Sequence, residues 1–203
     1  MADADAISKA DVTRARLIDA ALIAFAAKGF HATTTRDIAA GAGLSSAALY
    51  VHHKSKEELL YLIAHNGHEQ TLQLIRSAAA KSTSPVEQLQ RIVYDFVLYH
   101  AREHTTARVV NYELGALTPE HYKEIARLRH RIDRTIRTVL DRGVFDGDFV
   151  AVEPRVVTVA VLSLGIDVAR WYREGGTWTP EVLAQRYADM ALRLAGAQPA
   201  TRR

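Results

Sequence analysis

The sequence predicts an all-α protein with a small N-terminal domain of three helices and a larger C-terminal helical domain. Apolar residues recur at helical spacing along almost the whole chain, and no segment reads convincingly as a strand. Three segments place a capping side chain directly before a proline, a common way to start a helix: Ser84-Pro85, Thr118-Pro119 and Thr179-Pro180. Residues 33–58 contain three further helix starts around a glycine turn. Starts this close together indicate a compact module rather than a solenoid or one extended helix.

The first predicted helix carries an apolar stripe and ends at Gly29. Leu17, Ala21 and Phe25 follow one another at intervals of four residues, so they share one face of the helix. We expect this face to hold the next two helices together.

The next two helices have the spacing of a helix-turn-helix. Thr34 and Asp37 form a capping-box pattern, in which the hydroxyl accepts from the backbone and the carboxylate favours the positive helix end. Gly43 supplies a left-handed turn, and Ser45 caps a short helix that extends to His53. The second helix of such a motif enters the major groove of DNA. Its residues expected to face base edges are Ser45, Ser46, Ala47 and Ala48.

The remaining helices are predicted from caps, prolines and glycines. Ser55 and Glu58 repeat the capping-box spacing and open a long helix to about Ala80. Later helices are expected from Pro85 through Leu98, from Pro119 to Gly143, from Pro154 to about Tyr172 and from Pro180 to Gly196, with a loop over 142–148. Residues 1–8 and 197–203 are expected to be disordered tails.

Composition limits the classes of function. The 203 residues include no cysteine, which excludes disulfides, thiolate metal sites and cysteine nucleophiles. No apolar run approaches the roughly 18 residues of a membrane span and no leader pattern is present, so we expect a soluble cytoplasmic protein that does not enter a membrane. The formal charge is only +3, but residues 8–56 hold seven Lys or Arg against three Asp. This local excess indicates a polyanionic partner for the N-terminal segment.

Patterns typical of enzymes are sparse. No glycine-rich phosphate loop follows a strand, and no serine has the G-x-S-x-G context. His100 and His104 stand four residues apart with Glu103 between them, a spacing that can bind zinc on a helix, but no third ligand can be identified. The same holds for His65, His68 and Glu69. We therefore expect no enzyme activity, no cofactor and no metal.

Residues 29–59 contain an ordered series of short motifs. A Gly-Phe pair is followed by a Thr pair, Arg-Asp-Ile-Ala, an Ala-Gly turn, Leu-Tyr, a histidine and Ser-Lys-Glu-Glu-Leu. The residues concerned are Gly29, Phe30, Thr33, Thr34, Arg36, Asp37, Ile38, Ala39, Ala42, Gly43, Leu49, Tyr50, His52, Ser55, Lys56, Glu57, Glu58 and Leu59. Over residues 10–60 this order resembles the TetR-type (TetR/AcrR) family of bacterial transcriptional repressors. Val51 and His53 depart from it, because the family more often has a polar residue and a phenylalanine there, and Gly41 softens the first motif helix.

The resemblance implies a DNA-binding regulator and assigns its phosphate contacts. The residues that match phosphate-contacting places of the family are Thr33, Thr34, Arg36, Tyr50, His52 and Lys56. A packed aromatic remains the alternative for Tyr50, and solvated charges remain the alternative for Arg36 and Lys56. The base-facing set contains no Arg, Asn or Gln, so specificity would depend on thymine methyl groups, serine hydroxyls, water and DNA shape.

The resemblance also divides the chain into a DNA-binding domain, 9–54, and a ligand-binding and dimerisation domain, 55–196. A homodimer is expected on physical grounds, because one short recognition helix makes few contacts and two-fold pairing doubles them on a palindromic operator. In the family, two late helices of each subunit form the interface. The apolar residues expected there are Val157, Val161, Leu164, Val168, Leu183, Tyr187, Met190 and Leu194. The alternative for them is the ordinary core of one chain.

Members of the family have a ligand cavity between the long helix that begins near Ser55 and these two late helices. Residues 162–196 are similar to actinobacterial members that control fatty-acid or sterol breakdown, several of which respond to acyl-coenzyme A thioesters. The residues expected to line such a site are Phe96, Val110, Leu114, Leu128 and Trp171, with Arg170, Arg131, Arg134 and Arg137 available for phosphates. An uncharged apolar or aromatic effector is the rival, and Asp167 and Arg170 could simply pair on a helix surface with Trp171 in the core.

We therefore expect a dimeric repressor that a small molecule releases from its operator. The alternative is a helical small-molecule-binding or interaction protein with little specific DNA binding. The sparse base-facing set favours this alternative, whereas the local positive charge and the phosphate-matching residues oppose it.

Overall fold

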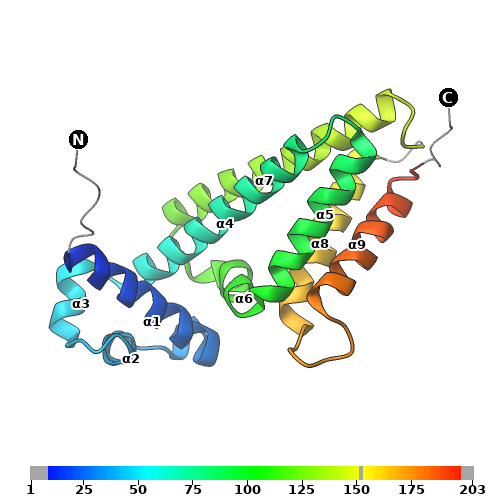
Figure 1. Cartoon of the computed structure of the whole chain (residues 1–203). Helices are drawn as coiled ribbons and strands as arrows, with labels where there is room; N and C mark the ends of the chain where they lie inside the picture. The colour runs from blue at the N-terminus through cyan, green and yellow to red at the C-terminus, as the bar shows by residue number, and fades with distance from the viewer. Residues whose placement is uncertain (1–8, 151–152, 198–203) are drawn as a thin grey trace, which may run out of the picture. The chain divides into compact units, whose positions relative to one another are not determined.

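The computed structural model describes residues 9–150 and 153–197 (Figure 1). Over these ranges the chain consists of helices joined by turns and loops, and its only β feature is an isolated bridge between Phe149 and Ala197. The helices are α1 (Lys9–Ala32), α2 (Thr35–Gly41), α3 (Ser46–His52), α4 (Lys56–Ala80), α5 (Pro85–Arg102), α6 (His104–Tyr112), a short 3-10 helix (Leu114–Ala116), α7 (Pro119–Phe145), α8 (Pro154–Trp171) and α9 (Pro180–Leu194). The predicted all-α fold is confirmed. In the described part, no helix has the length and apolar character that crossing a membrane requires.

The chain forms two compact units. The N-terminal unit comprises residues 1–67 and 108–124, and the C-terminal unit comprises residues 68–107 and 125–203. Helices α4, α6 and α7 therefore each contribute to both units. The functional boundary expected between residues 54 and 55 stays a prediction.

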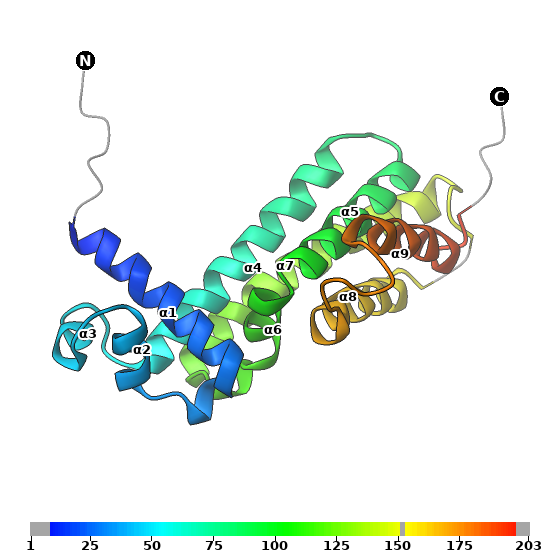
Figure 2. The same ribbon diagram turned by 60° about the horizontal axis from the view of Figure 1, so that its bottom comes forward.

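In the N-terminal unit, α1, α2 and α3 pack against one another (Figure 2). Leu17, Phe25 and Leu49 are fully or almost fully buried in their common core. The predicted break at Gly29 is present as a kink, because this residue has φ 77° and ψ 163° near the C-terminal end of α1. The predicted end of the first helix at Gly29 is therefore confirmed, and a short helical turn follows to Ala32.

In the C-terminal unit, α5 packs against α8 and α9, and the three helices lie side by side in both views (Figures 1 and 2). The contact between α5 and α8 is close at Gly165, where an added Cβ would lie 2.5 Å from a ring carbon of Phe96. Such a distance leaves room only for glycine. The predicted helix starts are confirmed at Ser84 and Thr179, whose hydroxyls accept from the backbone N–H groups of Glu87 and Val182.

Three details of the predicted organisation were wrong. Helix α5 ends at Arg102 and a separate helix begins at His104, so His100 and His104 do not share a helix. Helix α7 continues to Phe145, which shortens the predicted 142–148 loop. Ala197, assigned to a disordered tail, is described and donates its N–H to Leu192 O at 2.9 Å. The rest of the predicted tails, 1–8 and 198–203, lies outside the described residues.

Candidate nucleic-acid interface and effector cavity

The first helix of the motif is capped as its sequence predicts. The N–H of Asp37 donates to Thr34 Oγ1 at 3.1 Å, and the N–H of Thr34 donates to Asp37 Oδ2 at 2.9 Å. The backbone hydrogen bond from Thr34, followed by its hydroxyl and by Lys28, lowers the pKa of Asp37 to about 2. The carboxylate is therefore ionised at neutral pH and holds the start of α2 in place.

The turn between α2 and α3 is closed by a residue that sequence reasoning missed. Gly43 has φ 66°, a left-handed conformation that favours glycine. Arg16 of α1 donates to the carbonyl oxygen of Ala42 at 2.5 Å. An added Cβ on Gly43 would lie 3.1 Å from Arg16 Nη2, so the guanidinium sits against the turn itself. The two partners are separated by 26 residues, and no local pattern signals the contact.

Helix α3 presents one side to the core and an uncharged side to solvent. Ser45 Oγ accepts from the N–H of Ala48 at 3.2 Å, and Leu49 is fully buried. Ser45, Ala47, Tyr50 and Val51 are exposed, while Ser46 and Ala48 are half-buried. Tyr50 is 56% exposed, and its hydroxyl lies 3.3 Å from Thr35 Oγ1 on α2. Tyr50 is therefore not a packed core aromatic.

Thr33 is a correction to the predicted phosphate contacts. Its side chain is turned toward α1 and only 1% of the residue is exposed. The hydroxyl lies 2.8 Å from Gly29 O and 3.1 Å from Ala24 O. The hydroxyl therefore faces these α1 carbonyls and does not reach the surface.

Lys56 has a structural role that the sequence did not reveal. Its ammonium donates to Phe30 O and Thr33 O at 2.8 Å each and to His31 O at 3.3 Å. It also lies 4.4 Å from the centroid of the Phe30 ring. Because an ammonium has three N–H groups, these three carbonyls occupy all of them. A direct phosphate contact by Lys56 would require some of these bonds to be given up.

The other predicted phosphate contacts lie at the surface. Thr34 and Arg36 are exposed, and His52 is half-exposed at the last turn of α3. Arg36 makes no ion pair with a carboxylate in the described part of the chain. These three residues and Tyr50 stay predicted phosphate contacts.

A second polar cluster in the N-terminal unit joins the first turns of α4 and α7. His121 Nδ1 lies 2.8 Å from Glu57 Oε1, which also accepts from the N–H of Thr118 at 2.9 Å. The rings of Tyr61 and His121 stack at 3.9 Å, and the Tyr61 hydroxyl donates to Glu124. This hydrogen bond raises the pKa of Tyr61 to about 12. Sequence reasoning missed the cluster, because partners some 60 residues apart leave no pattern along the chain.

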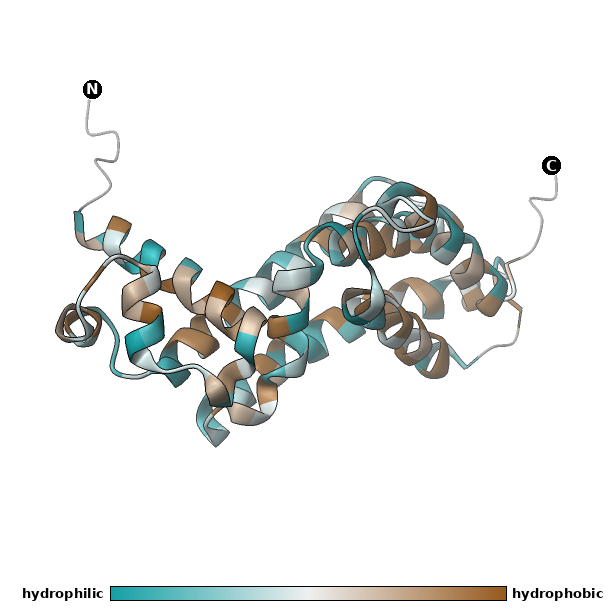
Figure 3. Cartoon of the chain, turned by 90° about the horizontal axis from the view of Figure 1, so that it is seen from below, coloured by the Kyte–Doolittle hydropathy of each residue, from teal (hydrophilic) through white to brown (hydrophobic). Residues whose placement is uncertain are grey.

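The predicted dimer residues fall into two groups. Four are buried in the core of the C-terminal unit and belong to the alternative that the sequence left open: Val157, Val161, Val168 and Leu183. Leu164 and Leu194 are 39% exposed, and Tyr187 and Met190 are half-buried beside them. Val156, Val159 and Val182 are further exposed apolar residues of the same two helices. The hydropathy colouring of the ribbon shows many apolar residues along the helices near the C-terminus (Figure 3). We call Leu164, Leu194, Val156, Val159 and Val182 the α8–α9 apolar strip.

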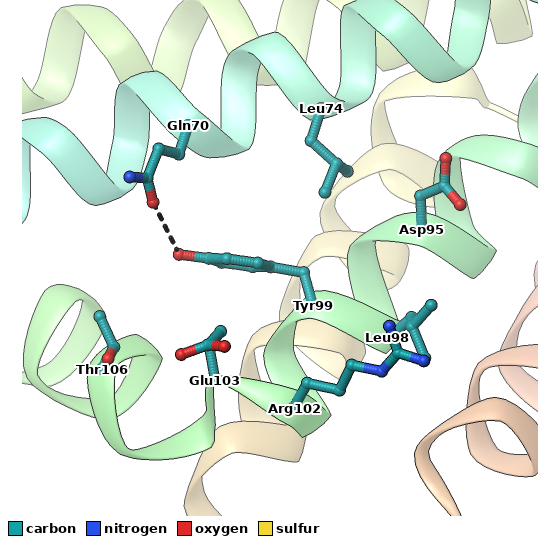
Figure 4. Close-up of a pocket in the computed structure, with 8 residues that line it drawn as sticks. All are labelled: Gln70, Leu74, Asp95, Leu98, Tyr99, Arg102, Glu103 and Thr106. Atoms are coloured by element: carbon teal, nitrogen blue, oxygen red, sulfur yellow. Dashed lines mark hydrogen bonds between the residues drawn. The ribbon is translucent and has the colours of Figure 1, made fainter.

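The C-terminal unit contains a cavity of about 570 Å³ that opens to solvent. Its lining residues come from α4, α5, α6 and the junction between α5 and α6: Gln70, Leu74, Asp95, Leu98, Tyr99, Arg102, Glu103 and Thr106 (Figure 4). Tyr99 reaches from α5 toward α4, where its hydroxyl donates to Gln70 Oε1 at 3.4 Å. Burial, with a smaller effect of Glu103, raises the pKa of Tyr99. Arg102 is paired with Glu181 at 2.7 Å and Asp95 with Lys81 at 3.6 Å.

The predicted ligand residues are not brought together in this cavity, and none of them lines it. Phe96 and Leu128 are buried in the core of the C-terminal unit, whereas Val110 and Leu114 are buried within the N-terminal unit. Arg170 is exposed and pairs with Asp167 at 2.6 Å, as the alternative expected. Trp171 is 38% exposed and is not a core residue.

Comparisons with known proteins cover both halves of the chain. The family model described as "Bacterial regulatory proteins, tetR family" matches residues 17–63, and that described as "Tetracyclin repressor-like, C-terminal domain" matches residues 82–195. The HTH-type transcriptional repressor KstR2 of Mycobacterium tuberculosis is 31% identical over 186 residues, which is 88% of this chain and 90% of that protein.

Solved structures give the same result. A bacterial regulatory protein in the tetR family from Rhodococcus RHA1 is 39% identical and superimposes with a TM-score of 0.88 over 95% of this chain and 100% of that one. AibR, solved in complex with isovaleryl coenzyme A and operator DNA, has a TM-score of 0.80 over 92% of this chain and 99% of its own, at 24% identity. At that identity the likeness is one of fold alone.

Proposed function

The chain belongs to the TetR family of bacterial regulatory proteins, and we propose that it is a transcriptional repressor and not an enzyme. In this proposal it binds a palindromic DNA operator as a homodimer, and a small molecule releases it from the DNA. The observation that carries this proposal is the helix-turn-helix: two capped helices, a left-handed Gly43 turn and an uncharged exposed face on α3. The second helix of such a motif enters the major groove with its exposed side toward the bases. The related KstR2 is described as a repressor, which favours repression over activation.

In this proposal the contacts to DNA fall into two groups. Base edges are met by Ser45, Ser46 and Ala47, and phosphates by Thr34, Arg36, Tyr50 and His52. Arg36 is the strongest phosphate candidate, because it is exposed and its guanidinium can form charge-assisted bonds to phosphate oxygens. Thr33 and Lys56 instead hold the end of α1, on which the motif packs.

The α8–α9 apolar strip supports the dimer. Five exposed apolar side chains on two neighbouring helices would form a sticky surface on a monomer. Contact with the same strip of a second copy removes this apolar surface from water. A two-fold contact buries the strip of each of the two subunits.

We propose the 570 Å³ cavity as the effector site. Its volume lies in the range of about 300–1,000 Å³ that small ligands occupy. Leu74, Leu98 and the Tyr99 ring offer apolar walls, and the Tyr99 hydroxyl and Gln70 amide offer a polar anchor. These groups suit an apolar or aromatic compound with a hydrogen-bonding end. An acyl-coenzyme A thioester is the second effector class, and the TetR fold holds one in AibR.

The function is tested by measuring how the purified protein binds duplexes from the DNA around its own coding region, at several salt concentrations. A repressor should prefer one duplex, and its log affinity should fall linearly with log salt. Equal affinity for all duplexes would favour the helical small-molecule-binding alternative. The effector class is determined by adding acyl-coenzyme A thioesters or the matching free acids to the protein–DNA complex and measuring the release of DNA. Similar release by both would exclude recognition of the coenzyme A phosphates.

The effector site has its own test. Leu98→Trp should fill the cavity and prevent release without changing DNA affinity in the absence of effector. Gln73→Trp is the matched control, because Gln73 is exposed on α4 and does not line the cavity. Equal release from both variants would place the effector elsewhere.

A further inference from the structure

Val51 is a conspicuous residue on the exposed face of α3. It is 80% exposed, more than any other large apolar side chain in the described part of the N-terminal unit. Ala47, four residues earlier on the same face, is exposed as well. A single exposed valine is ordinary on a protein surface. Val51, however, lies on the helix that is proposed to contact DNA, so its exposed side chain is placed to contact a base.

The neighbours of Val51 leave few other groups for base recognition. Residues 45–52 contain no Arg, Lys, Asn or Gln, the side chains that make bidentate bonds to base edges. Leu49 is buried, and the Tyr50 hydroxyl is engaged with Thr35 on α2. Apart from the serine hydroxyls, His52 and the Tyr50 ring, the exposed groups of α3 are therefore the methyl groups of Ala47 and Val51.

We propose that Val51, together with Ala47, reads thymine through its 5-methyl group, so that the operator carries a thymine under Val51 in each half-site. This inference depends on the proposed DNA-binding function. The thymine methyl is the one apolar group that a base pair presents in the major groove. Contact between it and the valine removes apolar surface from water on both partners, and no hydrogen bond is needed. A cytosine at the same place presents an amino group in the major groove, and valine has no acceptor for its hydrogen bond.

The test uses an operator selected from a pool of random duplexes by the purified protein. In that duplex, thymines are replaced one at a time by deoxyuridine, which removes the methyl group and leaves every hydrogen-bonding atom. With the unmodified protein, one position in each half-site should show a loss of about four-fold, the factor for one buried carbon at about 0.8 kcal/mol. Replacement in both half-sites should cost about 15-fold.

The Val51→Ala variant should bind the thymine and deoxyuridine duplexes almost equally. Its melting temperature should match that of the unmodified protein, because the side chain is exposed. Ile23→Ala is the control, since Ile23 is 69% exposed on α1 and lies outside the motif; it should keep the full methyl dependence. The inference is overturned if Val51→Ala keeps that dependence too, or if no thymine methyl contributes. A pool that yields no preferred sequence would overturn the proposed function along with it.

Discussion

Lys56→Met should lower the free energy of unfolding of the N-terminal unit by about 2–3 kcal/mol. The variant keeps the aliphatic chain and removes the ammonium that donates to Phe30 O and Thr33 O at 2.8 Å each. A hydrogen bond to a charged group contributes about 1.5–3 kcal/mol, and a cation near an exposed ring about 0.5–1 kcal/mol. Because Lys56 is half-exposed, water replaces part of these interactions, which reduces their sum to the stated loss.

The assay is urea unfolding followed by far-ultraviolet circular dichroism and by tryptophan fluorescence. Both tryptophans, Trp171 and Trp178, lie in the C-terminal unit, so the dichroism transition should shift more than the fluorescence transition. Lys54→Met, which removes an exposed ammonium two residues away, should change stability by less than about 0.5 kcal/mol. The reasoning is refuted if both variants are equally stable while Lys56→Met flattens the slope of log affinity against log salt by about one unit. In that case the ammonium contacts a phosphate instead.

Four further outcomes follow from single residues. Arg36→Ala should weaken DNA binding about equally on all sequences and flatten the salt slope by about one unit, without loss of stability; a slope that does not change would remove Arg36 from the phosphate contacts. Leu164→Glu should give monomers or insoluble protein by sedimentation velocity, whereas an unchanged dimer mass would show that the α8–α9 apolar strip is not the interface. Burial lowers the pKa of His100 from 6.5 to about 4, so the unfolded state binds more protons between these values. Stability should then be complete above pH 6.5 and fall by about 3 kcal/mol as the pH decreases toward 4, and His100→Gln should remove this share of the acid dependence. Gly165→Ala should destabilise the C-terminal unit by about 1–3 kcal/mol, measured by tryptophan fluorescence, because its Cβ would press on the Phe96 ring.

Helix starts could be predicted from the sequence because the groups that make them are neighbours along the chain. Thr34 with Asp37 and Ser45 with Ala48 are three residues apart, and each pair forms the expected hydrogen bond. The start of α6 has no such signal. Glu103 continues the helical spacing of α5, so the break at that residue is not visible in the sequence.

The contacts that fix the motif in space were not predictable in the same way. Arg16 reaches Ala42, and Lys56 reaches Phe30, each across 26 residues. In the sequence, neither Arg16 nor Lys56 differs in residue type or spacing from a charged residue on a solvated surface. The tertiary fold alone decides that these two cations bind carbonyls while Arg36 stays free of a carboxylate partner in the described part of the chain.

The sequence could not separate core from surface among the predicted dimer residues, for a related reason. Helix α8 carries apolar residues on more than one face, and periodicity cannot assign one face to the core and another to a partner. Val161 and Val168 are buried in the core of the C-terminal unit, whereas Leu164 between them is 39% exposed. Only the packing of the neighbouring helices separates the two sets.

The central claim, that a two-fold dimer reads a palindrome through α3, is tested most directly by changing the spacing of the operator. The selected duplex is compared with one that carries five extra base pairs between its half-sites, which rotates the second half-site by about half a helical turn. A rigid two-fold dimer cannot then place both recognition helices in the groove, so affinity should fall to that of a duplex with one scrambled half-site. Equal affinity for the original and the lengthened duplex would contradict the account.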